Sequence, residues 1–323
     1  KCSLSNILLY LSMKKDRMSQ IKYYIFVVLL SVSSFIFAQD IDKNSTKIDV
    51  EINALIETAQ QSSIQKNYYK SIDHLEKALE KAKESGNANT VGEIQTLLAE
   101  SYFKSKKYDS AYQYVIQGKT SHINSVNEAF LGRTYVVEGK INFQNKKYNE
   151  ALMNFDNAEA IFVKLKSIPE QSEVSLYYGL VFLETKDYKK ATQAFDAAIN
   201  QSKSSGKLRL IEARAKIYNG YIEFLDKQYD KASILINEGI TIAHENNGVY
   251  TVYEGYAKLG ELHAETGNYE LAYKNEILKQ QYKDSLLIIN HLNINETQKE
   301  EFITEESDLN DQLAKGKKEK AEN

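Results

Sequence analysis

The chain of 323 residues has one cysteine, one proline and no tryptophan. Because the single cysteine, Cys2, lies at a terminus, both a disulfide framework and a cysteine nucleophile in the body of the chain are excluded. With one proline and only 14 glycines, long stretches can form uninterrupted helices. The proline itself, Pro169, is expected to open a helix, since its fixed φ suits the first helical turn.

Motifs that carry catalytic chemistry are also scarce. The five histidines are scattered, and no two lie on one helix at the spacing of metal ligands. The triplet Gly118-Lys119-Thr120 looks like the end of a phosphate-binding loop, but Gln113 stands where that loop needs its first glycine. No Gly-x-Ser-x-Gly motif occurs. We therefore expect no enzymatic activity, no metal and no cofactor.

Tyrosine, in contrast, is abundant, and six of the 23 tyrosines recur at intervals of 40 or 41 residues. They are Tyr68, Tyr108, Tyr148, Tyr188, Tyr229 and Tyr269. Nine residues before them stand Ala59, Ala99, Gly139, Gly179, Gly220 and Gly260. The third residue after each tyrosine is small, the seventh is large and apolar, and the tenth is small; Glu276 and Lys279 break the last two rules in the sixth copy. This register predicts an internal repeat.

The spacing predicts two antiparallel helices in each repeat, joined by a tight polar turn, with the tyrosine at the start of the second helix. We expect the small residue of the first helix to meet the small residues of the second where the helices cross. One hairpin cannot bury its apolar face, so the copies are expected to stack into a continuous core. The expected hairpins cover about 47–86, 90–121, 127–166, 171–204, 208–245 and 250–282.

These residues resemble the tetratricopeptide repeat family over residues 52–282. The best-matching segments are LAESY (98–102), KDYKKA (186–191) and GNYELA (267–272). The departure is length, since the family's usual repeat has 34 residues. The resemblance implies an all-α fold, a right-handed α-solenoid of about six stacked hairpins over residues 47–283. Residues 284–323 are expected to form a capping helix and a charged helical linker or tail.

The N-terminal region has the pattern of a secretory signal. Lys22 precedes the apolar run Ile25–Phe37, which ends in Ala38 and is shorter than the ~20 residues that span a bilayer. We assign residues 1–38 to an upstream extension plus a signal peptide and residues 39–46 to a polar leader, and we expect export to the periplasm. An uncleaved anchor is the alternative. Residues 1–38 carry five basic residues and one acid, a balance of +4, which leaves −7 for the rest of a chain whose total is −3. This acidity argues against nucleic acid as a partner of the solenoid itself.

Binding of a protein or an extended peptide is the function that the resemblance implies, on the concave face that the first helices line. The candidate binding residues are Arg133, Lys140, Tyr177, Arg214, Tyr218 and Tyr221. Their cations would bind carboxylates and their rings would pack on the peptide. The alternative is that some of these rings pack between hairpins. Flanking glutamates would reject a purely acidic ligand: Glu93, Glu100, Glu173, Glu254 and Glu261. The lysine–asparagine clamp of chaperone-tail binders is not carried over, because Ile56 and Gln60 stand in its place.

Two roles remain open for such a module. The first is the exported sensory or interaction region of a larger signalling protein, similar to bacterial membrane-tethered histidine kinases or transcription regulators. The charged segment from Glu300 to Asn323 motivates it. This role implies an inner-membrane tether beyond Asn323 and allows a homodimer through the C-terminal helix. The second is a stand-alone periplasmic scaffold or assembly factor, for which a stop codon would follow Asn323 directly.

Overall fold

The computed structural model describes residues 47–123, 127–203 and 208–287. Within these ranges all regular secondary structure is helical and no strand is present. The chain divides into two compact units, residues 1–54 and 55–323. The described part of the first unit, residues 47–54, is helical; everything below concerns the second unit. The segments 1–38, 39–46 and 288–323, to which we assigned a signal, a leader and most of a tail, lie outside the described residues.

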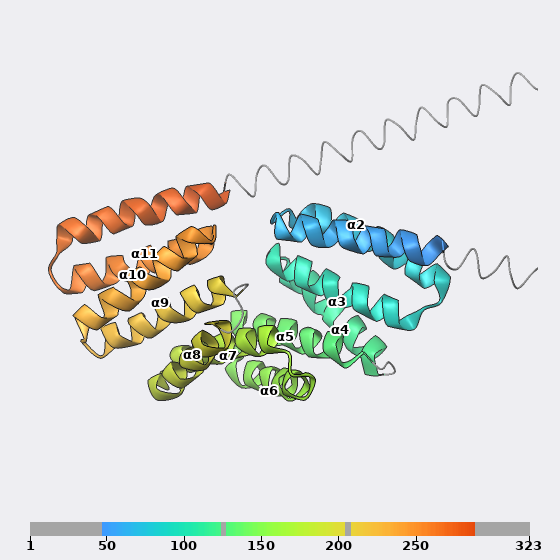
Figure 1. Cartoon of the computed structure of the whole chain (residues 1–323), viewed down its shortest axis with the longest axis horizontal. Helices are drawn as coiled ribbons and strands as arrows, with labels where there is room; N and C mark the ends of the chain where they lie inside the picture. Colours follow the sequence, from blue (N-terminus) through green and yellow to red (C-terminus); the bar gives the residue numbers. More distant parts are fainter. Residues whose placement is uncertain (1–46, 124–126, 204–207, 288–323) are drawn as a thin grey trace, which may run out of the picture. The chain divides into compact units, whose positions relative to one another are not determined.

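The helices of the second unit follow one another as antiparallel pairs (Figure 1). Those with both ends described are α2 (Tyr68–Ser85), α3 (Ala88–Lys104), α4 (Tyr108–Ile123), α5 (Glu128–Gln144), α6 (Tyr148–Leu165), α7 (Ile168–Glu184), α8 (Tyr188–Lys203), α9 (Arg209–Leu225), α10 (Tyr229–Glu245) and α11 (Val249–Glu265). Helical residues 55–64 pair with α2, and helical residues 269–287 pair with α11. The predicted all-α fold of six stacked hairpins is therefore confirmed.

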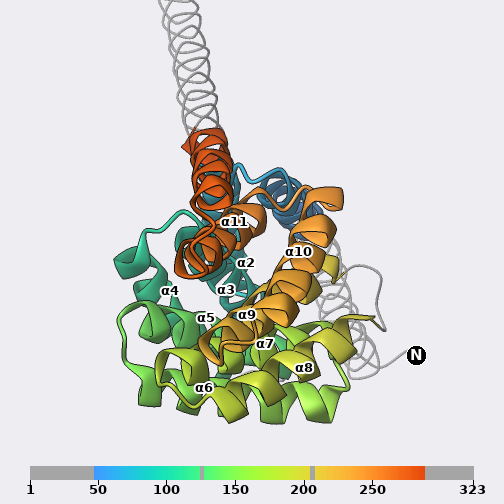
Figure 2. The same cartoon turned by 90° about the vertical axis from the view of Figure 1, so that its left-hand side faces the viewer.

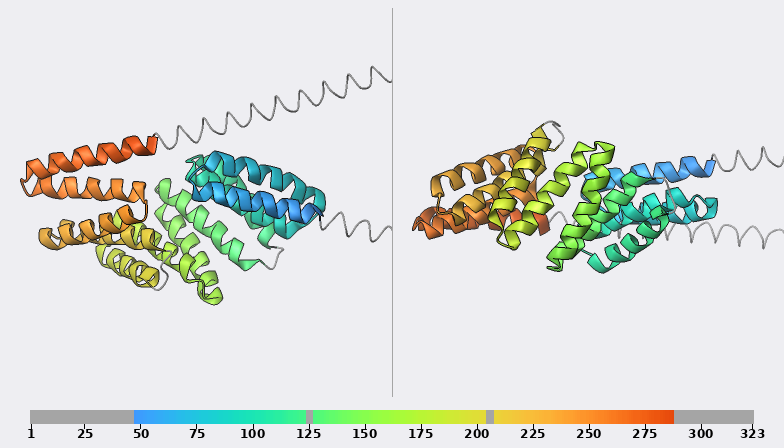
Figure 3. Two further views of the ribbon diagram at one scale, coloured as in Figure 1. Left: turned by 45° about the horizontal axis from the view of Figure 1, so that its top comes forward. Right: turned by 90° about the horizontal axis from the view of Figure 1, so that it is seen from below.

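The first helices of successive hairpins pack directly on one another: α3 on α5, α5 on α7, α7 on α9 and α9 on α11. Each second helix also packs on the first helix of the next hairpin: α2 on α3, α4 on α5, α6 on α7, α8 on α9 and α10 on α11. Figures 2 and 3 follow the same order of pairs from other directions. One surface of the stack is thus built mainly from first helices, and we call it the first-helix face.

The turns within the hairpins have one geometry. As predicted, each second helix begins at its repeat tyrosine. The residue two positions before the tyrosine has a left-handed backbone: it is a lysine with φ between 58° and 64° in five turns, and Gly267, with φ 74°, in the sixth. The next residue closes the first helix, as when Asp187 donates its backbone N–H to the carbonyl of Phe182 at 2.8 Å. The left-handed position was not predicted, because lysine has no preference for it.

The glycines of the third to fifth hairpins meet a large side chain of the second helix, which our expectation of small residues alone left out. At Gly220 the expected small residue is also met, since a built Cβ would lie 2.9 Å from the backbone oxygen of Ala232. A Cβ built on Gly179 would lie 2.4 Å from the ring of Phe195, and one on Gly220 would lie 2.7 Å from Ile236. Both neighbours occupy the seventh position after the repeat tyrosine. A Cβ on Gly260 of the sixth hairpin would have nothing nearer than 3.9 Å. Glycine therefore makes room for a buried side chain in the third to fifth hairpins, and the sixth hairpin does not need glycine for this reason.

A buried polar network joins the second and third hairpins. The hydroxyl of Thr96 lies 2.8 Å from that of Thr134 and 3.0 Å from Nε2 of His122. His122 is 2% exposed, and a Cβ on Gly92 would lie 2.9 Å from its ring, so the glycine makes space for the imidazole. Burial lowers the pKa of His122 below its ordinary value of 6.5. Elsewhere, Pro169 lies in the first turn of α7, as predicted.

Candidate functional site

The six candidate residues all lie on first helices. Arg133 and Lys140 lie on α5, Tyr177 lies on α7, and Arg214, Tyr218 and Tyr221 lie on α9. Because α5, α7 and α9 adjoin in that order, the structure brings the six onto the first-helix face. All six side chains are partly buried, so their partners within the chain decide what each can offer a ligand.

Arg133 binds Glu100 of α3 through two hydrogen bonds. Its Nε donates to Oε1 at 2.8 Å and its Nη2 donates to Oε2 at 2.7 Å. Burial alone would raise the pKa of Glu100, but the nearby cations Arg133, Lys104 and Lys140 together outweigh burial and hold that pKa below its usual value. The pair is a bidentate ion pair that ties α3 to α5.

Lys140 makes the corresponding link between α5 and α7. Its ammonium donates to Oε1 of Glu173 and lies 5.0 Å from the ring centroid of Tyr177 and 5.9 Å from that of Phe103. Burial opposes the charge of the ammonium, but Glu173, together with Tyr177 and Glu100, outweighs burial and raises the pKa of Lys140. The lysine is therefore held as a cation between two rings and a carboxylate.

Arg214 ties α9 to α11 in the same manner. Its Nε and Nη2 each donate to Glu254 at 2.8 Å, and the hydroxyl of Tyr218 donates to the same carboxylate at 2.7 Å. The guanidinium lies 5.7 Å from the ring centroid of Tyr218 and 5.6 Å from that of Tyr250. Burial disfavours its charge, yet Glu254 raises the pKa of Arg214 well above its ordinary value. The first-helix face thus carries three such cation–carboxylate links.

Of the three candidate tyrosines, two pack between hairpins, as the alternative reading of the sequence allowed. Tyr218 stacks on Phe195 with ring centroids 5.9 Å apart, and Tyr177 lies 5.6 Å from Phe155. Tyr221 has the ammonium of Lys258 3.7 Å from its ring centroid. Burial, with a smaller contribution from nearby Glu261, raises the pKa of Tyr221 to about 12.

The glutamates that we expected to reject acidic ligands are, in three cases, partners of the candidate cations. A signal for this pairing is present in the sequence. Glu100 and Arg133 are opposite charges 33 residues apart, Lys140 and Glu173 repeat that distance with the signs exchanged, and Arg214 lies one full repeat before its partner. In both pairs 33 residues apart, the first partner directly follows the small residue of its own repeat. The second partner stands six residues before the small residue of the next repeat. Comparing charges across copies would have found these links.

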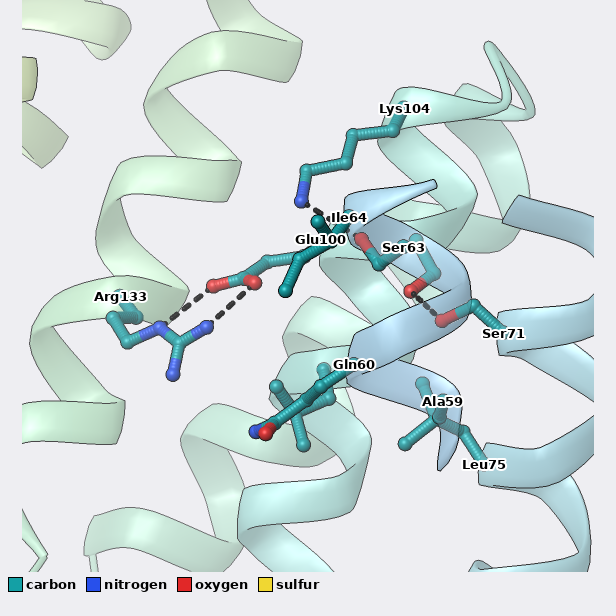
Figure 4. A pocket seen from close by; sticks show the side chains of 11 residues that line it. Ala59, Gln60, Ser63, Ile64, Ser71, Leu75, Glu100, Lys104 and Arg133 are labelled. Atoms are coloured by element: carbon teal, nitrogen blue, oxygen red, sulfur yellow. Dashed lines mark hydrogen bonds and ion pairs between the residues drawn. The ribbon is translucent and has the colours of Figure 1, made fainter. Parts of the chain in front are cut away.

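Two adjoining cavities open on the first-helix face. The larger has a volume of about 540 Å³, and we call it the central groove. It is lined by Glu100, Phe103, Lys104, Arg133, Val136, Val137, Lys140, Phe162, Glu170, Glu173 and Tyr177. The smaller, of about 270 Å³, is shown in Figure 4, and we call it the N-terminal pocket. It is lined by Ala59, Gln60, Ser63, Ile64, Ser71, Leu75, Leu97, Glu100, Ser101, Lys104 and Arg133.

The two cavities share Glu100, Lys104 and Arg133, so they are continuous along the face. The central groove combines both signs of charge with the rings of Phe103 and Tyr177. Across the residues that the structure describes, no three histidine, cysteine or acidic side chains are grouped as metal ligands. None of the described helices is both long enough and apolar enough for a bilayer span. The lining suits a chain molecule that has both polar and apolar side chains.

No protein-family model and no curated protein matches the chain. Solved structures do. An aspartyl phosphate phosphatase F from Bacillus subtilis is 15% identical with a TM-score of 0.59, over 88% of this chain and 76% of that one. A Rap protein complexed with competence and sporulation factor is 17% identical with a TM-score of 0.58, over 78% and 80%. A signal transduction ATPase with a tetratricopeptide repeat sensor, from Pyrococcus horikoshii, is 17% identical with a TM-score of 0.55, over 82% and 44%. The fold is therefore that of the tetratricopeptide-like helical repeats.

Proposed function

We propose that the first-helix face binds an extended peptide or protein segment in the central groove. The observation that carries the proposal is the groove itself: about 540 Å³ between α3, α5 and α7, with rings and both signs of charge in its lining. Its charged side chains are largely held by partners on neighbouring helices, so the surface is ordered before a ligand arrives. The Rap structure of similar fold was solved with a bound factor, which supports a ligand on this kind of scaffold.

We propose further that this module is exported and serves as the sensory or interaction region of a membrane-tethered signalling protein. The sequence supports export through the apolar run Ile25–Phe37 after Lys22. A fusion of residues 1–46 to a reporter enzyme that is active only outside the cytoplasm tests it. Reporter activity is expected, and activity no higher than that of the unfused reporter would contradict export.

The proposed activity is binding without turnover. One solved structure of similar fold is an aspartyl phosphate phosphatase, and that activity belongs to that protein. An assay with an aspartyl-phosphorylated response regulator separates the two cases: the phosphoryl group is expected to decay at the same rate with and without this protein. Faster decay that scales with protein concentration would contradict binding alone.

Selection from a random peptide library on the purified chain tests binding directly. We expect selected peptides to lose affinity by about tenfold, or ~1.4 kcal/mol, when Glu170→Trp fills one side of the groove. Glu265→Trp is the matched control, because Glu265 is exposed and lies at the C-terminal end of α11, away from the groove lining. Failure to select any peptide would contradict the proposed function. So would equal affinity of the Glu170→Trp variant, provided that its helicity is unchanged.

A further inference from the structure

The central groove has walls of opposite charge. Arg133 and Lys140 line it from α5, and Glu170 and Glu173 line it from α7. One bridge joins the walls, because the ammonium of Lys140 donates to Oε1 of Glu173. Arg133 and Glu170 are the remaining pair, each nearer to the N-terminus of its helix. What these two side chains bind decides whether the walls have a second bridge.

Arg133 does not bridge the groove to Glu170. Its guanidinium turns to α3, where Nε and Nη2 donate to Glu100 at 2.8 and 2.7 Å (Figure 4). Glu100 does most to raise the pKa of Arg133, and Glu173 and Glu170 contribute less. Among the described residues, the one side chain that hydrogen-bonds the carboxylate of Glu170 is Ser167, whose hydroxyl donates to it. A neutral hydroxyl compensates only part of the negative charge of Glu170.

The end of the groove that contains Glu170 has an excess of negative charge. Three charged residues line the central groove without also lining the N-terminal pocket: Lys140, Glu170 and Glu173. Their formal charges sum to −1, and because Lys140 and Glu173 bind each other, the excess resides on Glu170. Lys104, which lines both cavities, donates to Ser63 at 3.2 Å instead. A cationic group of a ligand is therefore favoured at the Glu170 end.

The floor between the two walls is apolar. Val136, Val137 and Phe162 line it, and they are 4%, 2% and 1% exposed. Gly132 makes room for the ring of Phe162, since a built Cβ would lie 2.8 Å from that ring. Long basic side chains lay their methylene groups along apolar surface while the charged end reaches a polar partner. A carboxylate beside an apolar floor suits such a side chain.

Resting on the proposed function, we propose that the central groove binds an arginine or lysine side chain of the peptide, with the carboxylate of Glu170 as the group that recognises its charge. The guest side chain takes the place of the second bridge: its cation binds Glu170 of α7, and its methylene groups lie on the floor. Arg133 does not repel the guest strongly, because Glu100 neutralises it. Arginine is the better guest, since its planar group can make two hydrogen bonds to one carboxylate.

Parallel selections from a random peptide library, on the purified full chain and on its Glu170→Gln variant, test the proposal. Glutamine keeps the size of the side chain and removes its charge. We expect Arg or Lys to be enriched at one position of the peptides selected on the wild type, and this enrichment to be lost on the variant. Glu150→Gln is the matched control and should keep the enrichment. Glu150 is exposed in the first turn of α6, as Glu170 stands in the first turn of α7, so it has the same interaction with its helix dipole, but it lines neither cavity.

Titration of synthetic peptides then measures the coupling between the two charges. Glu170→Gln should weaken binding about tenfold, and so should replacement of the basic residue of the peptide by methionine, a change that leaves the protein intact. Both changes together should cost little more than one, because they remove the same contact. Selected peptides without enriched Arg or Lys, equal affinity for the Glu170→Gln variant, or two changes whose effects multiply independently would overturn this inference while the proposed function stands. If no peptide is selected, the proposed function fails and the inference fails with it.

Discussion

The pair of substitutions Gly179→Ala and Gly260→Ala isolates the contact that forces glycine onto the first helices. Both residues stand nine positions before a repeat tyrosine, and both lie inside a helix. At Gly179 the new Cβ would lie 2.4 Å from the ring of Phe195, so the ring or the helix must move. At Gly260 the nearest atom would be Cβ of Asn275, at 3.9 Å. The chemistry of the change is identical, and only the packing differs.

Replacing glycine by alanine inside a helix favours the fold by roughly 1 kcal/mol. Overpacking a tight core typically costs about 1–3 kcal/mol. We therefore expect Gly260→Ala to raise the free energy of unfolding by about 1 kcal/mol, since it gains helix propensity and meets no clash. Gly179→Ala should lower the free energy of unfolding by up to about 2 kcal/mol, which places the two variants about 1–3 kcal/mol apart.

Equilibrium unfolding in urea, followed by far-ultraviolet circular dichroism, measures both variants against the wild type. The slope of the free energy of unfolding against urea concentration must be the same for all three proteins, because stacked repeats can lose cooperativity and unfold in parts. If the two substitutions change stability equally, the ring of Phe195 is not what restricts position 179 to glycine.

Three further predictions follow from the links and turns. Arg214→Met should cost about 2–3 kcal/mol, because it leaves the buried carboxylate of Glu254 without its cation; adding Glu254→Gln should recover part of the loss, and a double-mutant cycle without coupling would contradict the link. Because burial lowers the pKa of His122, the unfolded chain binds that proton more readily, so the free energy of unfolding should rise with pH up to about 6.5 and then level off. His122→Gln should flatten this rise relative to the wild type, in which His263 contributes in the same direction, and an unchanged slope would contradict the reasoning. Lys186→Gly should stabilise the fold by about 0.5–1 kcal/mol in urea unfolding, because glycine adopts its left-handed backbone at no steric cost; a loss of stability would contradict this.

The hairpins could be predicted from the sequence because their determinants are local. Tyr188 begins α8, and Ala191 and Phe195 follow on its buried side, all within one turn or two of the tyrosine. The partner of Gly179 could not be derived with the same certainty, because it depends on the rotation of two helices about their axes. Spacing fixes which residues share a helix face, but it does not fix which of them touches the facing glycine.

The candidate site was predicted less completely. The sequence placed Arg133, Lys140 and Arg214 on the right helices, but it treated each cation as available to a ligand. Whether a cation is available depends on the side chains that face it from the next hairpin, and these are 33 or 40 residues away. Glu170 was not among the candidates, since a glutamate in the first turn of a helix is ordinarily explained by the helix dipole.

The most direct test of the proposed function is hydrogen–deuterium exchange on the chain with and without a selected peptide. The proposal predicts slower exchange of backbone amides in α3, α5 and α7, whose side chains line the central groove, with α8 and α10 unchanged. Protection confined to second helices, or spread evenly over all hairpins, would show that the peptide binds elsewhere and would contradict binding on the first-helix face.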